Sequence, residues 1–267
     1  MESYRHGFRA GDGESYHQSS LMQHRGGCSV IDTLLRPVLG EAILDVGCGT
    51  GRLTLELASR VGESGRVVGV DPSESRIDIA KAELAKQDSH AAAVTYLQGN
   101  VKEARSLGPF DAIFSNYVFH WFERADRQGI VRDIYECLKP GGRLVSRLKP
   151  LQTQPNSCTN DVFALAMPTS DFESASGLKL DPPAVWSQIF TEAGFSVEVC
   201  EERDEEIKTP NLQAILRLLE ISVPSFRMQL LKSSDVEILN KKYRTGEGEE
   251  VSIVTKDLKI LAKKPEA

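Results

Sequence analysis

A short glycine-rich segment carries the clearest chemical signal in the sequence. It follows an apolar run and occupies residues 47–51, GCGTG. Glycines at the point where a strand turns into a helix allow the backbone to approach a ligand closely. Asp71 lies about 20 residues beyond them, at the end of the next apolar run, where a carboxylate can accept hydrogen bonds from both hydroxyls of a ribose. The pattern therefore predicts a ligand that contains a nucleoside.

The spacing of the glycines distinguishes two classes of such ligand. Dinucleotide sites favour the spacing GxGxxG, in which a helix N-terminus faces a pyrophosphate. Here the glycines follow GxGxG, and Arg52 occupies the place of the third dinucleotide glycine. Asp45 would repel a pyrophosphate but can pair with the ammonium group of an amino acid. This combination favours S-adenosylmethionine (SAM), whose methionine end is zwitterionic.

A nicotinamide-dependent oxidoreductase is the alternative interpretation of the same segment. Tyr135 and Lys139 have the YxxxK spacing of some dehydrogenases. They lie, however, in an amphipathic helix that leads into a turn, which disfavours a catalytic pair.

Alternating strands and helices must position these residues. Five strands are predicted from short apolar runs, at 42–46, 67–71, 94–98, 110–114 and 143–147. Regular alternation of this length predicts a parallel sheet with helices on both faces. Before the first strand, we expect two short helices near 15–25 and 29–37. Gly26 and Gly27 should separate them, because a glycine pair disfavours a continuous helix.

The regular alternation ends near residue 148. Residues 149–182 are rich in Pro, Ser, Thr, Asn and Asp, which predicts an irregular insertion. A helix opened by Pro182 and Pro183, a strand at 195–200, a helical stretch at 211–240 and a last strand at 250–262 should follow. We expect four parts: an arm with helices over the active site (1–40), a cofactor-binding core (41–148), a cap with one helix and strand of the core (149–245) and a C-terminal strand (246–267).

Several of these segments resemble the motifs of class I SAM-dependent methyltransferases. Residues 44–51 (LDVGCGTG) are similar to the first motif of that family, 70–71 (VD) to the second, and 139–142 (KPGG) to the turn before the fifth strand. Residues 99–101 (GNV) fall where the family holds the adenine, with Asn100 in place of the usual Asp; its carbonyl oxygen can still accept from the adenine amino group. The resemblance covers about residues 40–148. It implies a Rossmann-like α/β fold with a mostly parallel seven-stranded sheet, a partly helical cap, and SAM as cofactor.

Two further segments resemble the carboxyl O-methyltransferases of small acids. The Tyr16…Gln23 stretch is similar to the segment before the first strand of insect juvenile hormone acid methyltransferases and of the plant SABATH enzymes. The Asn116…His120-Trp121 stretch is similar to the segment after their fourth strand and to that of bacterial trans-aconitate methyltransferases. In the first two groups a Gln and a Trp hold the acceptor carboxylate. The resemblance thus assigns that role to Gln23 and Trp121, and places Tyr16 near the cofactor.

The chemistry of such an acceptor agrees with these residue types. A carboxylate is already ionised at pH 7, with an unperturbed pKa near 4, and needs no catalytic base. It needs neutral N–H donors that place one oxygen in line with the S–CH₃ bond. The amide of Gln23 and the indole of Trp121 are such donors, whereas a salt bridge to Lys or Arg would weaken the nucleophile.

Other interpretations of these residues are open. Trp121 could be a core or rim aromatic, Gln23 an exposed helix residue, and His120 a base for a phenol or amine acceptor. The corresponding alternatives are a methyltransferase that acts on nitrogen, sulfur or a phenolic oxygen of a small metabolite, and a SAM-binding protein without activity. We expect Gln23, Trp121 and His120 to act on the acceptor. The residues expected to bind the cofactor are Tyr16, Asp45, Gly47, Cys48, Gly49, Gly51, Asp71, Pro72, Asn100, Val101, Ser115 and Asn116.

Composition excludes several other functions. The net charge of −6 disfavours a nucleic-acid groove, which needs clustered Lys and Arg. No apolar run approaches the roughly 20 residues that span a bilayer, and the first residues lack a signal peptide's apolar core. The five cysteines are scattered and form no CxxC pair, so we expect neither disulfides nor a metal site, and a reducing cytoplasm. A monomer or homodimer is expected. The predicted cap contains apolar residues and no Arg cluster, which favours a monoacid with an apolar body.

Overall fold

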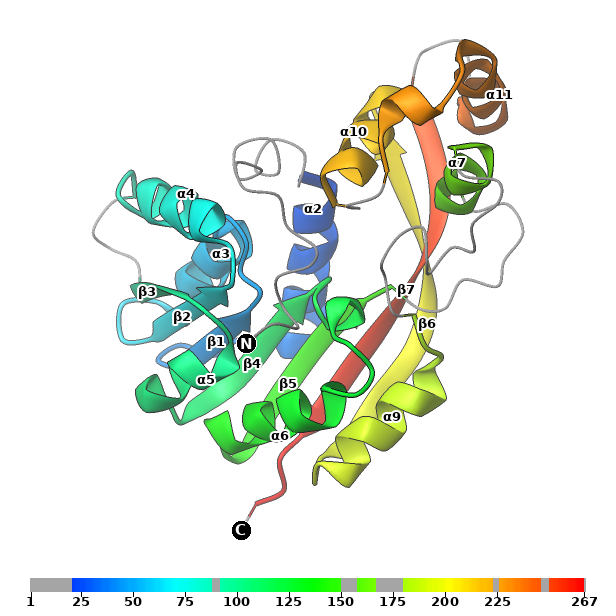
Figure 1. Cartoon of the computed structure of the whole chain (residues 1–267). Coiled ribbons are helices and arrows are strands. Elements are labelled where there is room, and N and C mark those ends of the chain that lie inside the picture. The colour runs from blue at the N-terminus through cyan, green and yellow to red at the C-terminus, as the bar shows by residue number, and fades with distance from the viewer. Residues whose placement is uncertain are drawn as a thin grey trace.

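The computed structural model describes residues 21–87, 92–149, 158–166, 180–222, 226–245 and 250–266. Their strands form one seven-stranded sheet with the order β3-β2-β1-β4-β5-β7-β6 (Figure 1). Strands β1 to β5 pair in parallel, and β7 runs antiparallel to both β5 and β6. This confirms the predicted Rossmann-like fold. The strands are β1 Ala42–Val46, β2 Arg66–Asp71, β3 Ala93–Gln98, β4 Phe110–Asn116, β5 Leu138–Leu148, β6 Ser196–Thr209 and β7 Val251–Lys263.

Helices cover both faces of this sheet. One face packs against α5, α6 and α9, and the other against α2, α3 and α4 (Figure 1). The described α-helices are α2 Leu21–Val30, α3 Arg52–Val61, α4 Glu74–Leu84, α5 Val101–Ala104, α6 Arg127–Cys137, α7 Cys158–Ala166, α9 Pro183–Glu192, α10 Leu212–Ser222 and α11 Ser233–Tyr243. None of these helices combines the length and the apolar character that crossing a bilayer requires.

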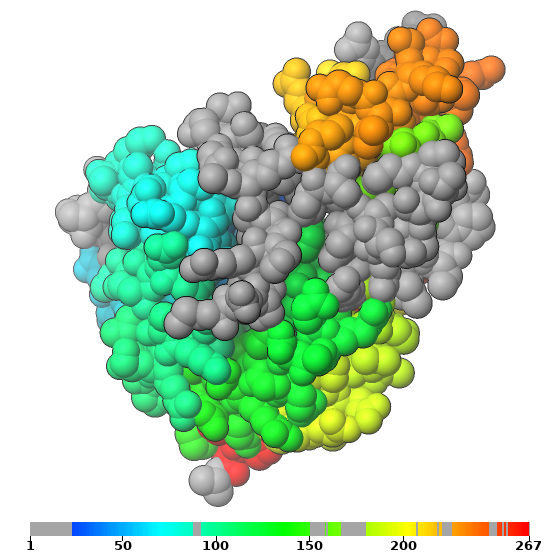
Figure 2. All heavy atoms as spheres, viewed as in Figure 1, coloured from blue at the N-terminus to red at the C-terminus, as the bar shows by residue number. Residues whose placement is uncertain are grey.

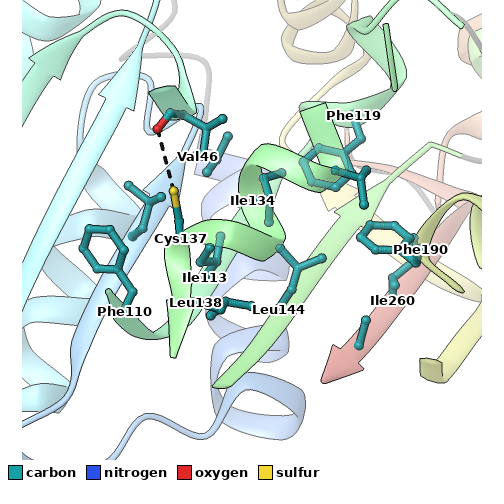
Figure 3. Close-up of a cluster of buried hydrophobic side chains, with 14 of the residues drawn as sticks. Val46, Phe110, Ile113, Phe119, Ile134, Cys137, Leu138, Leu144, Phe190 and Ile260 are labelled. Atoms are coloured by element: carbon teal, nitrogen blue, oxygen red, sulfur yellow. Dashed lines mark hydrogen bonds between the residues drawn. The ribbon is translucent and has the colours of Figure 1, made fainter. Parts of the chain in front are cut away.

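The central strands are apolar throughout because both of their faces are covered. Every residue of β1 is buried: Leu44 joins the core under α6, whereas Ile43 joins the core under α2 and α3. Aromatic residues extend the first of these cores toward α9. Figure 3 shows Phe119 and Phe190 side by side there, with ring centroids 6.0 Å apart.

The predicted break at Gly26 and Gly27 is wrong, because α2 runs through both residues. A Cβ at Gly26 would lie 2.2 Å from Arg147 Nη1, and one at Gly27 would lie 2.5 Å from Leu53 Cδ1. The two glycines therefore let α2 approach β5 and α3 closely, and this packing outweighs their low helix propensity. Helix α2 continues into a π-helical turn at Ile31–Leu35.

Strands β6 and β7 form a long antiparallel pair that extends beyond the rest of the sheet (Figure 1). Strand β6 exceeds the predicted 195–200 because its charged residues pair across to β7, with Lys259 Nζ 2.7 Å from Glu205 Oε1. Helices α7, α10 and α11 pack at the far end of the β6–β7 pair, around a second apolar core that includes Phe163, Leu216 and Phe226. Figure 2 shows the α10 and α11 region as a protruding lobe. This lobe overlaps the predicted cap, whose boundaries stay a prediction.

Candidate cofactor and acceptor site

A pocket lies at the carboxyl ends of β1 and β4, beside α2 and the start of α3. In the sheet, β1 lies between β2, which follows it directly along the chain, and β4, so the direction of the strand order switches at β1. Ligands of open α/β sheets bind at such a switch point. The pocket brings together five predicted site residues with four others. Its lining is Gln23, His24, Asp45, Gly47, Cys48, Thr50, Arg52, Leu53 and Asn116.

The glycine turn shapes the floor of this pocket. Gly47 has φ of 74°, and a Cβ there would meet a methyl of Val118 at 2.2 Å. Gly51 has φ of 80° directly before α3. Residues with a side chain rarely adopt these φ values, so the turn requires glycine. It leaves the backbone accessible from the pocket.

Asp71 ends β2 and is 3% exposed. Its Oδ2 accepts the Gly49 N–H at 3.0 Å, and its Oδ1 accepts the Ser73 N–H at 2.9 Å. Burial raises the pKa of this carboxyl, and the charge of Arg76 opposes the shift. Each oxygen keeps a further lone pair, so the fixed carboxylate can accept from the two hydroxyls of a ribose.

Asp45 lies at the carboxyl half of β1 and is 2% exposed. Its Oδ2 accepts the Thr54 hydroxyl at 2.7 Å. Burial is the main cause that raises the pKa of Asp45 to about 7, and the charge of the nearby Asp71 contributes to this shift. A buried carboxyl with this environment disfavours a ligand phosphate and favours a ligand cation. The pair Asp45 and Asp71 therefore fits the ammonium and ribose groups of SAM better than a pyrophosphate.

Asn116 joins the end of β4 to α2. Its Nδ2 donates to the backbone oxygen of Gln23 at 3.4 Å. Its Oδ1 is buried and has no hydrogen-bond partner among the described residues. A buried acceptor of this kind at a pocket needs a donor, and a ligand ammonium group would supply one.

Other predicted cofactor residues lie at neighbouring strand ends with structural contacts of their own. Asn100 caps α5, since its Oδ1 accepts the Lys102 N–H at 2.9 Å. The Ser115 hydroxyl is buried and donates to the Val46 oxygen at 3.0 Å. Val101 is buried and Pro72 is half-buried. Their contacts with a cofactor stay predictions, and Tyr16 lies outside the described residues.

The predicted acceptor residues are divided between two places. Gln23 lies at the start of α2 and lines the pocket. His120 and Trp121 lie in a 3-10 turn after β4, with ring centroids 5.6 Å apart, and neither belongs to the pocket lining described above. His120 is buried, and its Nδ1 accepts the Lys149 N–H at 3.3 Å. Burial, with a smaller contribution from the charge of Lys149, lowers the pKa of His120 to about 3, so the imidazole is neutral.

Sequence reasoning missed a buried polar network beside the pocket. The Tyr117 hydroxyl donates to Asp257 Oδ1 at 2.7 Å, and Arg147 Nε donates to Asp257 Oδ2 at 2.7 Å. Tyr117 has φ of 59°, which is strained for a residue with a side chain. Arg147 also reaches Glu205 of β6. Arg147 and Asp257 each lie among other polar and charged residues of β5 and β7, so the sequence carries no local signal that they are buried together.

The residues of the dehydrogenase alternative lie elsewhere. Tyr135 packs edge-on against Phe195 with ring centroids 5.0 Å apart. Lys139 Nζ pairs with Asp111 at 2.7 Å, at the amino end of β4. Neither residue lines the pocket, so they do not form a catalytic pair with a ligand bound there.

Known proteins match mainly the central part of the chain. Residues 43–142 match a family described as a methyltransferase domain. A demethylmenaquinone methyltransferase of Lactococcus lactis is 38% identical over 107 residues, which cover 40% of this chain and 41% of that protein. An arsenite methyltransferase of Aquipseudomonas alcaligenes is 37% identical over 127 residues, 44% of this chain and 35% of that protein. The chain thus spans less than half the length of these curated relatives.

A solved structure shows the same fold over nearly the whole chain. The phosphoethanolamine N-methyltransferase 2 of Haemonchus contortus, in complex with phosphomonomethylethanolamine and S-adenosylhomocysteine, aligns with a TM-score of 0.60 at 18% identity. The alignment covers 96% of this chain and 58% of that one. The family match and the shared fold therefore agree with a methyltransferase domain over residues 43–142, as the sequence motifs predict.

Proposed function

We propose that this chain transfers the methyl group of SAM to the carboxylate of a small organic acid. SAM supplies an electrophilic methyl group on its sulfonium. The chain's own residues hold the two reactants in line and exclude water from the reacting atoms.

The observation that carries this proposal is the state of His120. An amine or phenol acceptor has to lose a proton, and a base is most effective when its pKa lies near the working pH. With a pKa of about 3 and Nδ1 engaged by Lys149, His120 is a weak base. A carboxylate needs no base, because it is ionised above a pH of about 4.

Neutral donors complete the arrangement. Gln23 lines the pocket, and its backbone oxygen is held by Asn116. We assign the amide of Gln23 and the indole of Trp121 to the two carboxylate oxygens. Uncharged N–H groups orient the nucleophile and leave its charge available for the attack on the methyl carbon.

The names of the relatives suggest other acceptors, a quinone precursor and arsenite. The family match covers residues 43–142, which hold Asp45, Asp71 and Trp121 but not Gln23. It therefore supports the choice of cofactor more strongly than the choice of acceptor. Demethylmenaquinone and arsenite are the comparison acceptors in the test.

A product assay distinguishes these acceptors. The full-length chain is incubated with SAM and either a panel of monocarboxylic acids, demethylmenaquinone or arsenite, and S-adenosylhomocysteine formation is measured. The proposal expects turnover with acids that carry an apolar body and none with the two comparison acceptors. Turnover with demethylmenaquinone or arsenite and none with the acids would replace the proposal with the corresponding activity.

A further inference from the structure

Helices α2 and α3 bring three metal-binding side chains together beside the pocket. His24 and Cys28 are four residues apart on α2 and therefore share one face of the helix. Glu56 lies on α3, which packs against that face. His24 also lines the pocket, so the cluster borders the cofactor site.

Two distances within this cluster, both from His24, are close to those of a tetrahedral zinc site. His24 Nε2 lies 3.7 Å from Cys28 Sγ and 3.4 Å from Glu56 Oε1. The three ligand atoms all lie within 4.8 Å of one another. Zinc bonds of about 2.3 Å to sulfur and about 2.1 Å to nitrogen and oxygen, at tetrahedral angles, separate N from S by about 3.6 Å and N from O by about 3.4 Å. The two pairs that include His24 therefore need little side-chain movement to reach that geometry.

We propose that His24, Cys28 and Glu56 bind one Zn²⁺ ion. A thiolate, an imidazole and a carboxylate together suit zinc, whereas Mg²⁺ and Ca²⁺ prefer sites made of oxygen ligands. The side chains of His24 and Glu56 are 24% and 35% exposed, so an ion can enter and keep a fourth position for water or a ligand. On binding, the Cys28 thiol releases its proton to water and the thiolate bonds to the metal.

A neighbouring ion pair already orients one of the ligands. Glu56 Oε2 pairs with Arg60 Nη1 at 2.7 Å, which leaves Oε1 directed at His24. Such contacts outside the ligand set commonly fix ligand orientation. The ion would join α2 to α3 and so hold the helix that carries Gln23. This inference does not depend on the identity of the methyl acceptor.

Cobalt substitution tests the site in the full-length chain. After treatment with a chelator and dialysis, Co²⁺ is titrated and the near-ultraviolet thiolate-to-cobalt absorption is recorded. We expect the band to saturate at one equivalent of Co²⁺ and to disappear when Zn²⁺ is added. Cys28→Ser should abolish the band, and Glu56→Gln should weaken Co²⁺ binding at least about tenfold.

Two matched variants serve as controls. Cys200→Ser removes a half-buried cysteine on β6 and should leave the band unchanged. Asp32→Asn removes the other carboxylate that pairs with Arg60, at 2.9 Å, and should leave Co²⁺ affinity unchanged. A band that persists in Cys28→Ser, no thiolate band in the wild type, or equal weakening by Glu56→Gln and Asp32→Asn would overturn the proposal. Glu56 is partly exposed, so its variant remains informative if Cys28→Ser does not fold.

Discussion

The guanidinium of Arg147 occupies the space in which a side chain at Gly26 would lie. A Cβ at Gly26 would come within 2.2 Å of Arg147 Nη1. Arg147 is 1% exposed and is held by Asp257 at 2.7 Å. Its Nη1 also lies 3.5 Å from the backbone oxygen of Gln23. Helix α2 thus packs directly against the buried ion pair between Arg147 of β5 and Asp257 of β7.

This contact predicts that Gly26→Ala destabilises the protein. The added methyl group must displace Arg147 or α2, and overpacking of this kind costs about 1–3 kcal/mol of unfolding free energy. The higher helix propensity of alanine offsets at most about 1 kcal/mol of this loss in unfolding free energy. Gly129→Ala in α6 is the control, because a Cβ there meets nothing within 4 Å, and it should stabilise the protein slightly. Urea unfolding measures both; similar stabilisation by the two substitutions would contradict the account.

The same contact explains why the break that the sequence predicts in α2 does not occur. Helix propensity is a local property, and it penalises Gly26 and Gly27 wherever they occur. The residue that requires a glycine at 26 is Arg147, more than 100 positions further along the chain. Pairings over such distances follow from the assembled sheet and cannot be read from local spacing.

Asp71 should control cofactor affinity. Asp71→Ala removes charged acceptors for the ribose hydroxyls and should weaken S-adenosylhomocysteine binding by about 1–3 kcal/mol. Calorimetric titration measures the change. Asp111→Asn is the matched control. Asp111 pairs with Lys139 at the amino end of β4, away from the carboxyl ends that form the pocket, so its loss should leave the affinity unchanged. Equal affinities for the wild type and Asp71→Ala would refute the ribose role.

Cofactor affinity should rise with pH through Asp45. In the ligand-free chain burial raises the pKa of Asp45 to about 7, so the carboxyl is mostly protonated at pH 6 and ionised at pH 8. Only the ionised form pairs with the ammonium group of the cofactor. The dissociation constant should therefore increase up to about tenfold per pH unit below pH 7 and become constant above it. Asp45→Asn should bind more weakly and lose this pH dependence, and a wild-type affinity that is constant from pH 6 to 8 would contradict the assignment.

Trp121 should affect turnover and spare cofactor binding. Trp121→Phe removes the indole N–H that we assign to the acceptor carboxylate, and misplacement of the nucleophile should lower kcat about tenfold to a hundredfold. Trp186→Phe provides the contrast, because Trp186 is fully buried in the core under Arg127 and its loss should lower stability first. Full turnover by Trp121→Phe would exclude Trp121 as a carboxylate ligand.

The two halves of the site differ in how far the sequence predicts them. The cofactor half includes Asp45, Gly47 and Asp71, which lie at the ends of two consecutive strands and so form a motif within one short stretch of sequence. The structure places them around the predicted switch point. The hydrogen bond from Thr54 to Asp45 joins residues nine positions apart, so it is also local in sequence, although the glycine motif does not predict it. On the acceptor side, Tyr117 follows β4 and Asp257 lies in β7, 140 positions further along the chain, so only the fold brings them together.

The fate of the transferred methyl group in mild alkali tests the central claim most directly. The full-length chain is incubated with methyl-labelled SAM and an accepted organic acid, and the product is then hydrolysed. A methyl ester releases the label as volatile methanol, which is the predicted result. Label that stays on the product in alkali would place the methyl group on nitrogen, sulfur, carbon, arsenic or a phenolic oxygen, and would contradict carboxylate methylation.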